Sequence, residues 1–231
     1  MIISGTDDTD RPTWTILVPT IPQRETTFLR LMAVLLPQLD AHEGRVRVLA
    51  WRNAGRPHLG ELRDRMLADA GTDYVSFIDD DDLVPDYYVA EIVKALAERP
   101  DHVGFQLDYT SDTDGVLGHE VVDHSLRHGR WCRDGEGRLV RDFTHIDPIR
   151  RDLATNASFA VARRGRAEDR QWVKQLRGWL RTEVYIDKIM YYYIWSYAGS
   201  SWGADKVVWP ADGPAPAVDH PHFEWHPRSL G

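Results

Sequence analysis

The 231-residue sequence is short of several features that define particular classes of protein. It has one cysteine, Cys132, so no disulfide can form within the chain, and a reducing compartment such as the cytoplasm fits. It has no run of about 20 apolar residues, so we expect no membrane span. The segment from Met1 to Arg11 is polar and acidic and lacks the basic start and apolar centre of a signal peptide. We therefore predict a cytoplasmic protein with a flexible N-terminal lead over residues 1–12.

Positive charge is also in short supply. The formal net charge is -8, so general binding of polyanions is not indicated. A local basic face is still compatible with this net charge. Aromatic residues, by contrast, are plentiful, with nine Trp and nine Tyr. Such residues mostly fill cores, but they also line sites that stack on rings.

Apolar, β-rich runs alternate with segments of helical spacing through the first half of the chain. We predict strands over 14–18, 46–51, 74–78 and 103–108, and helices over 26–39, 60–70 and 86–98. Alternation of this kind predicts an α/β domain with a mostly parallel central sheet and helices on both faces.

The second half of the sequence is harder to assign. We predict a small antiparallel element of short strands near 118–122 and 129–132, with a hairpin that ends near Val140. Further along we predict the start of a helix over 148–154, a helix over 166–180 and a strand over 185–195. The predicted organisation is one domain over 13–207, with halves 13–108 and 109–207, followed by an irregular Pro- and His-rich tail over 208–231.

An acidic run, Asp79–Asp80–Asp81–Asp82, follows the predicted third strand. Four adjacent carboxylates repel one another, and Mg²⁺ or Mn²⁺ prefers such oxygen ligands. The alternative is a solvated turn that caps the next helix, but Asp86 already offers that cap. We therefore favour a metal site. A parallel sheet would bring this run to the same edge as the segments 19–24 and 53–56.

Four segments, in order, resemble the family-2 glycosyltransferases, which have the GT-A fold of a single nucleotide-binding α/β domain. Val18-Pro19-Thr20 with Arg24 resembles the family's first strand and its nucleotide-contacting turn, and Gly60 to Leu67 resembles its Gly-x-Lys-Arg-Asn-x-Leu-Leu helix start. Phe77 to Pro85 resembles the metal-binding Asp-x-Asp segment. Ala167 to Trp172 resembles the Glu-Asp motif that supplies the catalytic base. Leu62 and Asp64 depart from the family's Lys and Asn, which puts those two contacts in doubt, whereas Arg63 is retained.

The resemblance implies a metal-dependent enzyme that moves a sugar from a nucleoside diphosphate sugar to a hydroxyl acceptor, with inversion. Implied contacts with the nucleotide sugar are Pro19, Thr20, Arg24, Asn53, Arg63, Asp79 and Asp80. For Mn²⁺ or Mg²⁺ the implied ligand is Asp81, supported by Asp79 and Asp82, while Asp80 is expected to point away. In some GT-A enzymes a C-terminal His is a further metal ligand, which makes His220 and His222 candidate ligands. The alternative is that this segment is a flexible polar tail.

The same resemblance assigns Asp169 as the catalytic base, with Glu168 beside it. Acidic residues in the first turn of a helix are also commonly present because they interact favourably with the helix dipole, and that interpretation stays open. Residues expected on the acceptor side are His145, Arg150, Arg151 and Trp172.

The acceptor is less well defined by the sequence. Arg150 and Arg151 belong to a local basic zone with Arg163, Arg164 and Arg166. That zone is either a solvated face or a site for a phosphate-bearing acceptor. The cluster is similar to small glycosyltransferase-like proteins of bacteriophages, which implies a hydroxymethylated DNA base as one acceptor, flipped out or single-stranded.

Two other functions compete with this interpretation. A nucleotidyltransferase also pairs a nucleotide-binding sheet with acidic metal ligands, but it normally has a Gly-rich loop after the first strand, and residues 19–22 contain no glycine. A catalytically inactive GT-A-like binding domain is the non-enzymatic alternative. The intact acidic run and the Glu-Asp pair argue against it.

Overall fold

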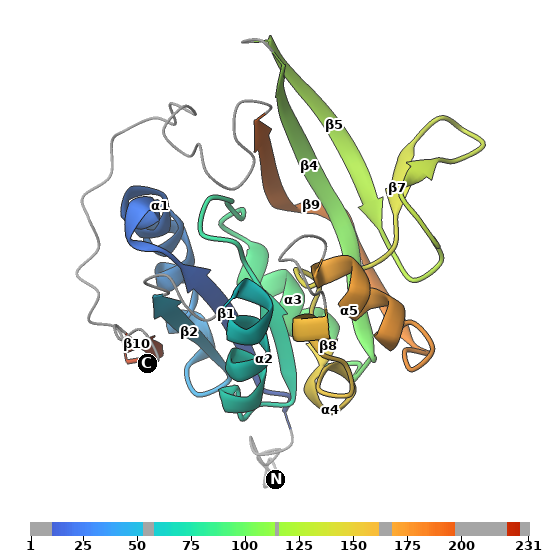
Figure 1. Cartoon of the computed structure of the whole chain (residues 1–231). Helices are drawn as coiled ribbons and strands as arrows, with labels where there is room; N and C mark the ends of the chain where they lie inside the picture. The colour runs from blue at the N-terminus through green and yellow to red at the C-terminus, as the bar shows by residue number, and fades with distance from the viewer. Residues whose placement is uncertain (1–10, 53–57, 114–115, 162–167, 197–220, 227–231) are drawn as a thin grey trace, which may run out of the picture.

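The computed structural model describes residues 11–52, 58–113, 116–161, 168–196 and 221–226. Within these residues one ten-stranded sheet has the order β10-β2-β1-β3-β8-β4-β5-β7-β6, with β9 paired to β4 (Figure 1). The strands are β1 (Trp14–Thr20), β2 (Val46–Arg52), β3 (Tyr74–Phe77), β4 (His102–Thr113), β5 (Val116–His124), β6 (Cys132–Arg133), β7 (Leu139–Arg141), β8 (Ile149–Arg150), β9 (Glu183–Ser196) and β10 (Phe223–His226). The α-helices are α1 (Glu25–Leu35), α2 (Leu59–Asp69), α3 (Tyr88–Leu96), α4 (Arg151–Ala154) and α5 (Glu168–Leu176).

The first half of the sheet confirms the predicted parallel arrangement. Strand β1 pairs in parallel with both β2 and β3, and the register sets Leu17 opposite Leu49 on one side and Phe77 on the other. All seven residues of β1 are buried, as expected for a central strand that is covered on both faces.

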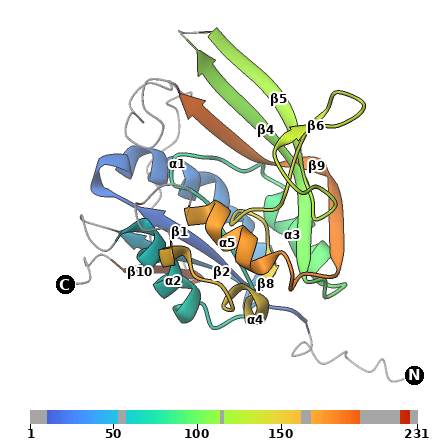
Figure 2. The same ribbon diagram turned by 45° about the vertical axis from the view of Figure 1, so that its right-hand side comes forward.

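Helices cover both faces of the sheet, as predicted (Figures 1 and 2). Alternate residues of each strand point to opposite faces, so Ile16 joins the core under α1 and α3, whereas Leu17 joins the core under α2 and α5. The second core also contains the 3-10 helix η5 (Phe159–Val161), which packs against α2. Gly60 makes this close approach possible, because a Cβ there would lie 2.7 Å from the carbonyl oxygen of Phe159.

The second half is more extended than the sequence analysis predicted. Strands β4 and β5 form a long antiparallel hairpin, paired from Phe105↔His124 to Thr113↔Val116, in place of a small element of short strands. Strand β9 runs parallel to β4, and the three strands rise together beside the helices (Figure 2). The boundary predicted at residue 108 falls inside β4, so the two halves share a strand.

Two short strands add to the predicted sheet. Strand β8 lies between β3 and β4 and runs antiparallel to both, and α4 follows it directly. Strand β10 lies within the segment that was expected to be irregular, and it pairs in parallel with β2. In the part of the chain that the structure describes, no helix combines the length and apolar character that crossing a membrane requires.

Candidate functional site

The acidic run lies where two parallel strands end. Strand β1 pairs with β3 as far as Leu17↔Phe77, so the last residues of β1 lie beside the acidic run that follows Phe77. The backbone N–H of Ile21 donates to Asp80 Oδ2 at 3.4 Å, and the N–H of Asp82 donates to the carbonyl of Asp79 at 3.1 Å, which closes a turn. This is the carboxyl edge of the sheet, where α/β folds bind ligands.

Arg24 connects the first turn with the acidic run. It lies in the 3-10 helix η2 (Pro22–Arg24), and its guanidinium contacts Asp80 Oδ1 at 2.8 Å and Asp81 Oδ2 at 2.9 Å. The side chain of Asp80 is 2% exposed and that of Asp81 28% exposed. Asp80 therefore lies beneath Arg24, which agrees with its expected orientation away from the nucleotide but not with a direct nucleotide contact.

A second arginine, Arg63 of α2, joins the acidic run to α5. Its Nη2 atom lies 2.6 Å from Asp79 Oδ1 and its Nη1 atom 2.7 Å from Glu168 Oε1. The guanidinium is buried and lies 5.5 Å from the centroid of the Phe77 ring. Burial opposes its charge, but Asp79, Glu168 and Asp169 together keep the pKa of Arg63 above its ordinary value. The motif residues from three distant segments thus form one connected group.

His145 belongs to the same group. Its Nε2 atom lies 3.0 Å from Arg63 Nη2 and 3.4 Å from Asp79 Oδ2. Burial opposes ionisation of Asp79, yet Arg63, His145 and Arg24 hold its pKa well below the ordinary value. His145, predicted on the acceptor side, therefore contacts the acidic run directly.

The last residue of the run, Asp82, faces the protein interior. Its side chain accepts a hydrogen bond of 2.8 Å from the hydroxyl of Tyr191 in β9. The same hydroxyl accepts the backbone N–H of Asp79 at 3.1 Å. Asp82 is 2% exposed, so it supports the turn rather than presenting a ligand to solvent.

The two acidic residues at the start of α5 differ in their surroundings. Glu168 is held by Arg63, whereas Asp169 is one residue further on and partly exposed. The charge of Asp169 acts on both Arg63 and Arg141. Asp169 is therefore the carboxylate of this pair that is not engaged in the ion pair with Arg63.

The two departures from the family pattern in α2 have structural roles. Leu62 is buried in the core beneath α2. Asp64 accepts hydrogen bonds from the Ser158 hydroxyl at 2.6 Å and the Phe159 N–H at 2.8 Å, so it holds η5 against the helix. Neither residue is directed at the carboxyl edge of the sheet, so Arg63 alone provides the contact of this segment with the site.

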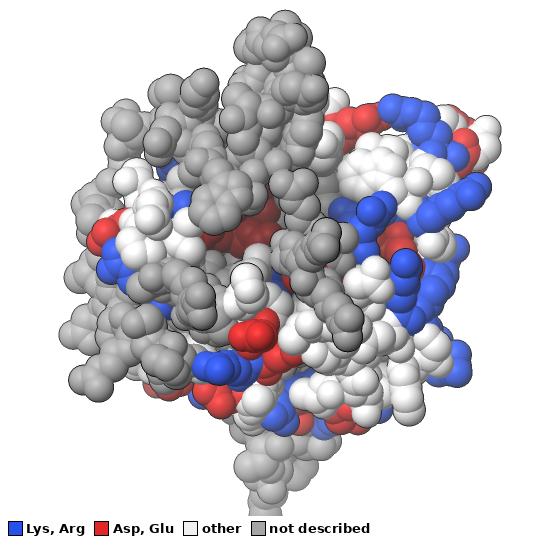
Figure 3. Space-filling model, in the orientation of Figure 1, with Lys and Arg blue, Asp and Glu red and all other residues white. Residues whose placement is uncertain are grey.

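The acidic run fits a divalent cation. Three carboxylates, those of Asp79, Asp80 and Asp81, share two guanidinium groups. Burial raises the pKa of Asp81 to about 6 despite Arg24, with Asp79 and Asp80 adding to the rise. A cation would relieve this excess of negative charge. Figure 3 shows acidic side chains within a hollow on this face and basic side chains along its right side. Within the described residues no three His, Cys, Asp or Glu side chains form a ready metal site, so a bound ligand or water would complete the coordination.

Several residues expected at the site lie elsewhere. Trp172 is 1% exposed and stacks on Phe159, with centroids 4.6 Å apart, because it lies on the core face of α5. Arg150 is opposite Tyr74 at the beginning of β3, and it pairs with Asp101 and Asp152. This is the amino edge of the sheet, away from the acidic run.

Arg151 and His222 are also distant from the acidic run. Arg151 donates to the carbonyls of Leu67 and Ala68 at the end of α2. His222 precedes β10, three strand spacings or about 14 Å from β3. His222, Arg150 and Arg151 therefore do not lie at the acidic run in this structure, and their roles as metal ligand and acceptor contacts stay predictions. Asn53, His220, Arg163, Arg164 and Arg166 lie outside the described residues.

The first-strand residues Pro19 and Thr20 are buried, and the Thr20 hydroxyl donates to the carbonyl of Ile21 at 3.5 Å. They support the turn from within. Tyr191 was not predicted at the site, although its hydroxyl is bonded to both ends of the acidic run. Its place in a strand with three consecutive tyrosines gives no signal for which ring meets the site.

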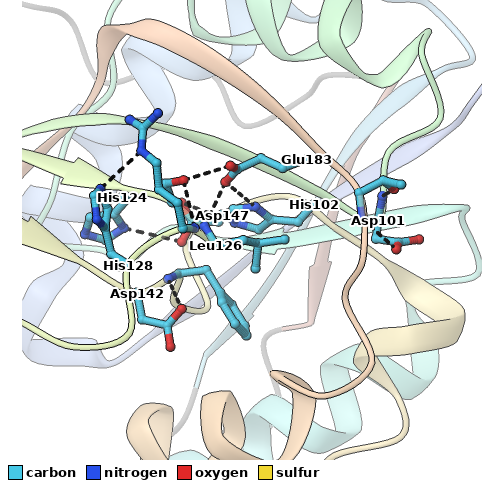
Figure 4. Close-up of polar contacts among 12 residues, drawn as sticks. Asp101, His102, His124, Leu126, His128, Asp142, Asp147 and Glu183 are labelled. Carbon is cyan, nitrogen blue, oxygen red and sulfur yellow. Dashed lines mark hydrogen bonds and ion pairs between the residues drawn. The ribbon is translucent and has the colours of Figure 1, made fainter.

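A buried polar network, also missed, holds the loop that carries His145. Figure 4 shows His102, His124, Asp147 and Glu183 between the strands. His124 Nδ1 lies 3.3 Å from Asp147 Oδ2, and His102 Nδ1 lies 3.2 Å from Glu183 Oε1. Asp147 also accepts the N–H of Thr144 at 2.5 Å, so the loop around His145 is anchored from below.

Three comparisons place this geometry among known proteins. The model of the glycosyl transferase family 2 matches residues 35–182. Solved structures of TarS from S. aureus share the fold at 15% identity and a TM-score of 0.56, over 79% of this chain and 36% of TarS. For TarS residues 1–349 in complex with UDP the values are 14% identity and a TM-score of 0.56, over 79% of this chain and 60% of that one.

The same TarS fragment in complex with UDP-GlcNAc matches at 14% identity and a TM-score of 0.53, over 79% of this chain and 58% of that one. No curated protein matches the sequence. The chain thus spans between about a third and three-fifths of the length of these structural relatives. Because the family model covers more than half of the sequence and the fold agrees with it, the chain belongs to the family-2 glycosyltransferases and has the GT-A fold.

Proposed function

We propose that this glycosyltransferase moves a sugar from a nucleoside diphosphate sugar to a hydroxyl group of an acceptor, with Mn²⁺ or Mg²⁺ at the acidic run. One observation carries the proposal. The partly open carboxylates Asp79 and Asp81 and the guanidinium groups of Arg24 and Arg63 converge at the carboxyl ends of β1 and β3, in reach of the α5 acids. Diphosphate, metal and proton acceptor each have a matching group in that set.

A uridine nucleotide is the donor that we propose to test first. TarS, whose fold this chain shares, has been solved with UDP and with UDP-GlcNAc. Arg24 and Arg63 supply fixed positive charge near the place where a diphosphate would lie. Arginine suits this task because its planar group can bind two phosphate oxygens together.

Asp81 and Asp79 are the residues that would hold the cation. Both side chains are partly exposed, whereas Asp80 and Asp82 are buried and bonded within the protein. A bound Mn²⁺ or Mg²⁺ would act as a Lewis acid that neutralises charge on the departing diphosphate. Arg24 and Arg63 orient the two carboxylates from either side.

Asp169 is the proposed general base. The acceptor hydroxyl oxygen forms a bond to the anomeric carbon while the bond from that carbon to the diphosphate oxygen breaks, and the hydroxyl proton moves to the Asp169 carboxylate. A single displacement of this kind inverts the anomeric centre. Glu168 is a positioning residue, because its ion pair fixes Arg63, which in turn holds Asp79.

Thermal shift measurements with UDP, with and without Mn²⁺, test the proposal. We expect UDP to raise the melting temperature only modestly alone and clearly more with Mn²⁺. Asp81→Ala should remove the Mn²⁺ increment. Asp86→Ala, which removes an exposed carboxylate from the same segment, is the matched control and should keep it. UDP binding that is indifferent to Mn²⁺ and to Asp81 would falsify the metal assignment. Binding without any transfer or hydrolysis of UDP-sugars would favour an inactive domain.

A further inference from the structure

A row of aromatic rings extends from the acidic run along the β4–β5 hairpin. Tyr193 of β9 and Tyr109 of β4 are neighbours across the sheet, with ring centroids 5.5 Å apart and an interplanar angle of 12°. Tyr109 meets Trp131 edge-on at 5.6 Å. Trp131 is 43% exposed, which is unusual for so large an apolar side chain. The row therefore ends in an open aromatic surface.

The inner end of this row is tied to the acidic run. Leu83, the residue after Asp82, exchanges two backbone hydrogen bonds with Tyr192 of β9, with N–O distances of 3.2 Å and 2.8 Å. Burial raises the pKa of Tyr193, and the carboxylates of Asp82 and Asp79 add to that rise, so these groups are near neighbours. A molecule that lies along the row would have one end at the donor site.

Arg141, the last residue of β7, lies over the outer end of the row. Its guanidinium carbon is 4.9 Å from the centroid of the Trp131 ring. Within the described residues this ring is the one close contact recorded for the guanidinium. Burial lowers the pKa of Arg141, and Asp169 offsets this only in part. Its guanidinium is therefore available to an anionic group of a bound molecule.

Three arginines around Arg141 differ from it, because each has a carboxylate partner. Arg127 is paired with Asp123 at 2.6 Å, Arg133 with Glu120 at 2.5 Å and Arg138 with Asp134 at 2.8 Å. A polyanion would need a continuous row of available cations along its path, and these three are already neutralised, so this surface suits a single anionic group better than a nucleic acid backbone.

We propose that Tyr193, Tyr109, Trp131 and Arg141 form the acceptor subsite, and that the acceptor is a carbohydrate which carries a phosphate or carboxylate group. The apolar face of a sugar ring lies against the exposed tryptophan, and Arg141 binds the anionic substituent. This inference rests on the proposed function, because it identifies the acceptor of the same site.

The test measures binding of glucose 6-phosphate, glucuronate and glucose by calorimetry, in the presence of UDP and Mn²⁺. We expect both anionic sugars to bind more tightly than glucose. Arg141→Gln should weaken the anionic sugars about tenfold or more and leave glucose unchanged. Trp131→Ala should weaken all three. Arg138→Gln, which removes an exposed and paired arginine three residues away, is the matched control and should change none of them.

Three outcomes would overturn the acceptor assignment. One is equal binding of glucose and the anionic sugars, or no binding of either anionic sugar at millimolar concentration. Another is anionic binding that is unaffected by Arg141→Gln, with only the rate of transfer reduced, since Arg141 would then act on Asp169 alone. A third is Arg141-dependent binding of an oligonucleotide with 5-hydroxymethylcytosine but of no sugar. UDP binding is recorded for each variant, so a failed nucleotide site is distinguishable from a failed acceptor site.

Discussion

The acidic run and the buried network around Asp147 both gather several charged groups, but only one of them is open. Asp79 and Asp81 are about one quarter exposed, and burial with neighbouring carboxylates raises the pKa of Asp81 to about 6. Asp147 is fully buried between His124 and His102, and despite that burial its pKa is held well below the ordinary value. The open cluster presents carboxylates to solvent, whereas the carboxylate of the closed one lies beside two imidazoles inside the fold. Carboxylates left open at a sheet edge indicate a ligand, and a carboxylate enclosed by hydrogen-bonding side chains indicates structural support.

The largest effect is expected from Asp169, because it would take part in the proton transfer itself. Asp169→Asn should reduce transfer from a UDP-sugar by about 100-fold to 10,000-fold, the range typical of a lost general base. UDP binding with Mn²⁺ should stay as in the unmodified protein, because Asp169 is not in direct contact with Asp79 or Asp81. Transfer is measured by release of UDP under saturating donor.

Glu168 supplies the comparison for that variant. Glu168→Gln keeps a hydrogen-bond acceptor for Arg63 but removes the charge. We expect a loss of about tenfold, shared between donor binding and transfer, because the pair acts only through Arg63 and the neutral amide keeps one hydrogen bond to it. If Glu168→Gln loses as much transfer as Asp169→Asn and binds UDP normally, the base is Glu168.

The buried network should affect stability rather than chemistry. Asp147→Asn leaves His124 without its carboxylate, and removes one of the two carboxylates beside His102, in a site that water does not reach. Loss of one partner from a buried charged group costs about 3–5 kcal/mol, which corresponds to about 10 °C in a protein of this size. Asp152→Asn is the control, because its carboxylate pairs with Arg150 on the surface and should contribute less than about 1 kcal/mol. Calorimetry of both variants checks the difference.

Sequence patterns were sufficient where the signal was local. The alternation of apolar residues located β1, β2, β3 and the helices between them, and the ordered motifs identified Arg24, Arg63, Asp81 and Glu168 as neighbours. Parallel strands bring their carboxyl ends to one edge, so distant segments could be placed together without coordinates.

The expectations that differ from the structure have one physical cause. The direction of a short strand and the orientation of a side chain depend on partners far along the chain. Arg150 lies at the wrong edge because β8 has two residues and runs antiparallel to β3, and so short a strand carries no directional pattern. Trp172 faces inward because Phe159 stacks on it. Strand β10 was missed because Phe223–His226 gains its order from pairing with β2 rather than from its own residues.

The acidic run and the network around Asp147 should also differ in how pH changes their contribution to stability, which is a smaller effect. The pKa of Asp81 rises from 3.8 to about 6, so its protonated form is favoured by folding. The stability that this gives is complete below about pH 4 and is lost as pH rises through about 6, on the order of 3 kcal/mol. Asp147 behaves oppositely: its lowered pKa stabilises the fold above its ordinary pKa and is lost only in acid.

Urea unfolding of the unmodified protein and Asp81→Asn, without metal between pH 4 and pH 7, measures this. The unmodified protein should lose stability relative to the variant across that range, and Mn²⁺ with UDP should restore it. A constant difference between the two proteins at every pH would show that Asp81 is ionised throughout.

The smallest effect is expected from loss of the Tyr191 hydroxyl, which joins β9 to the acidic run. Tyr191→Phe removes the donor to Asp82 and the acceptor of the Asp79 N–H, both away from solvent. We expect a loss of about 1–2 kcal/mol in unfolding free energy, and a several-fold weaker response of UDP binding to Mn²⁺, because the turn that presents Asp79 and Asp81 loosens. Tyr192→Phe, the adjacent ring, is the control for loss of a hydroxyl from β9. Equal effects of the two substitutions would mean that strand packing, and not the hydrogen bonds of Tyr191, holds the acidic run in place.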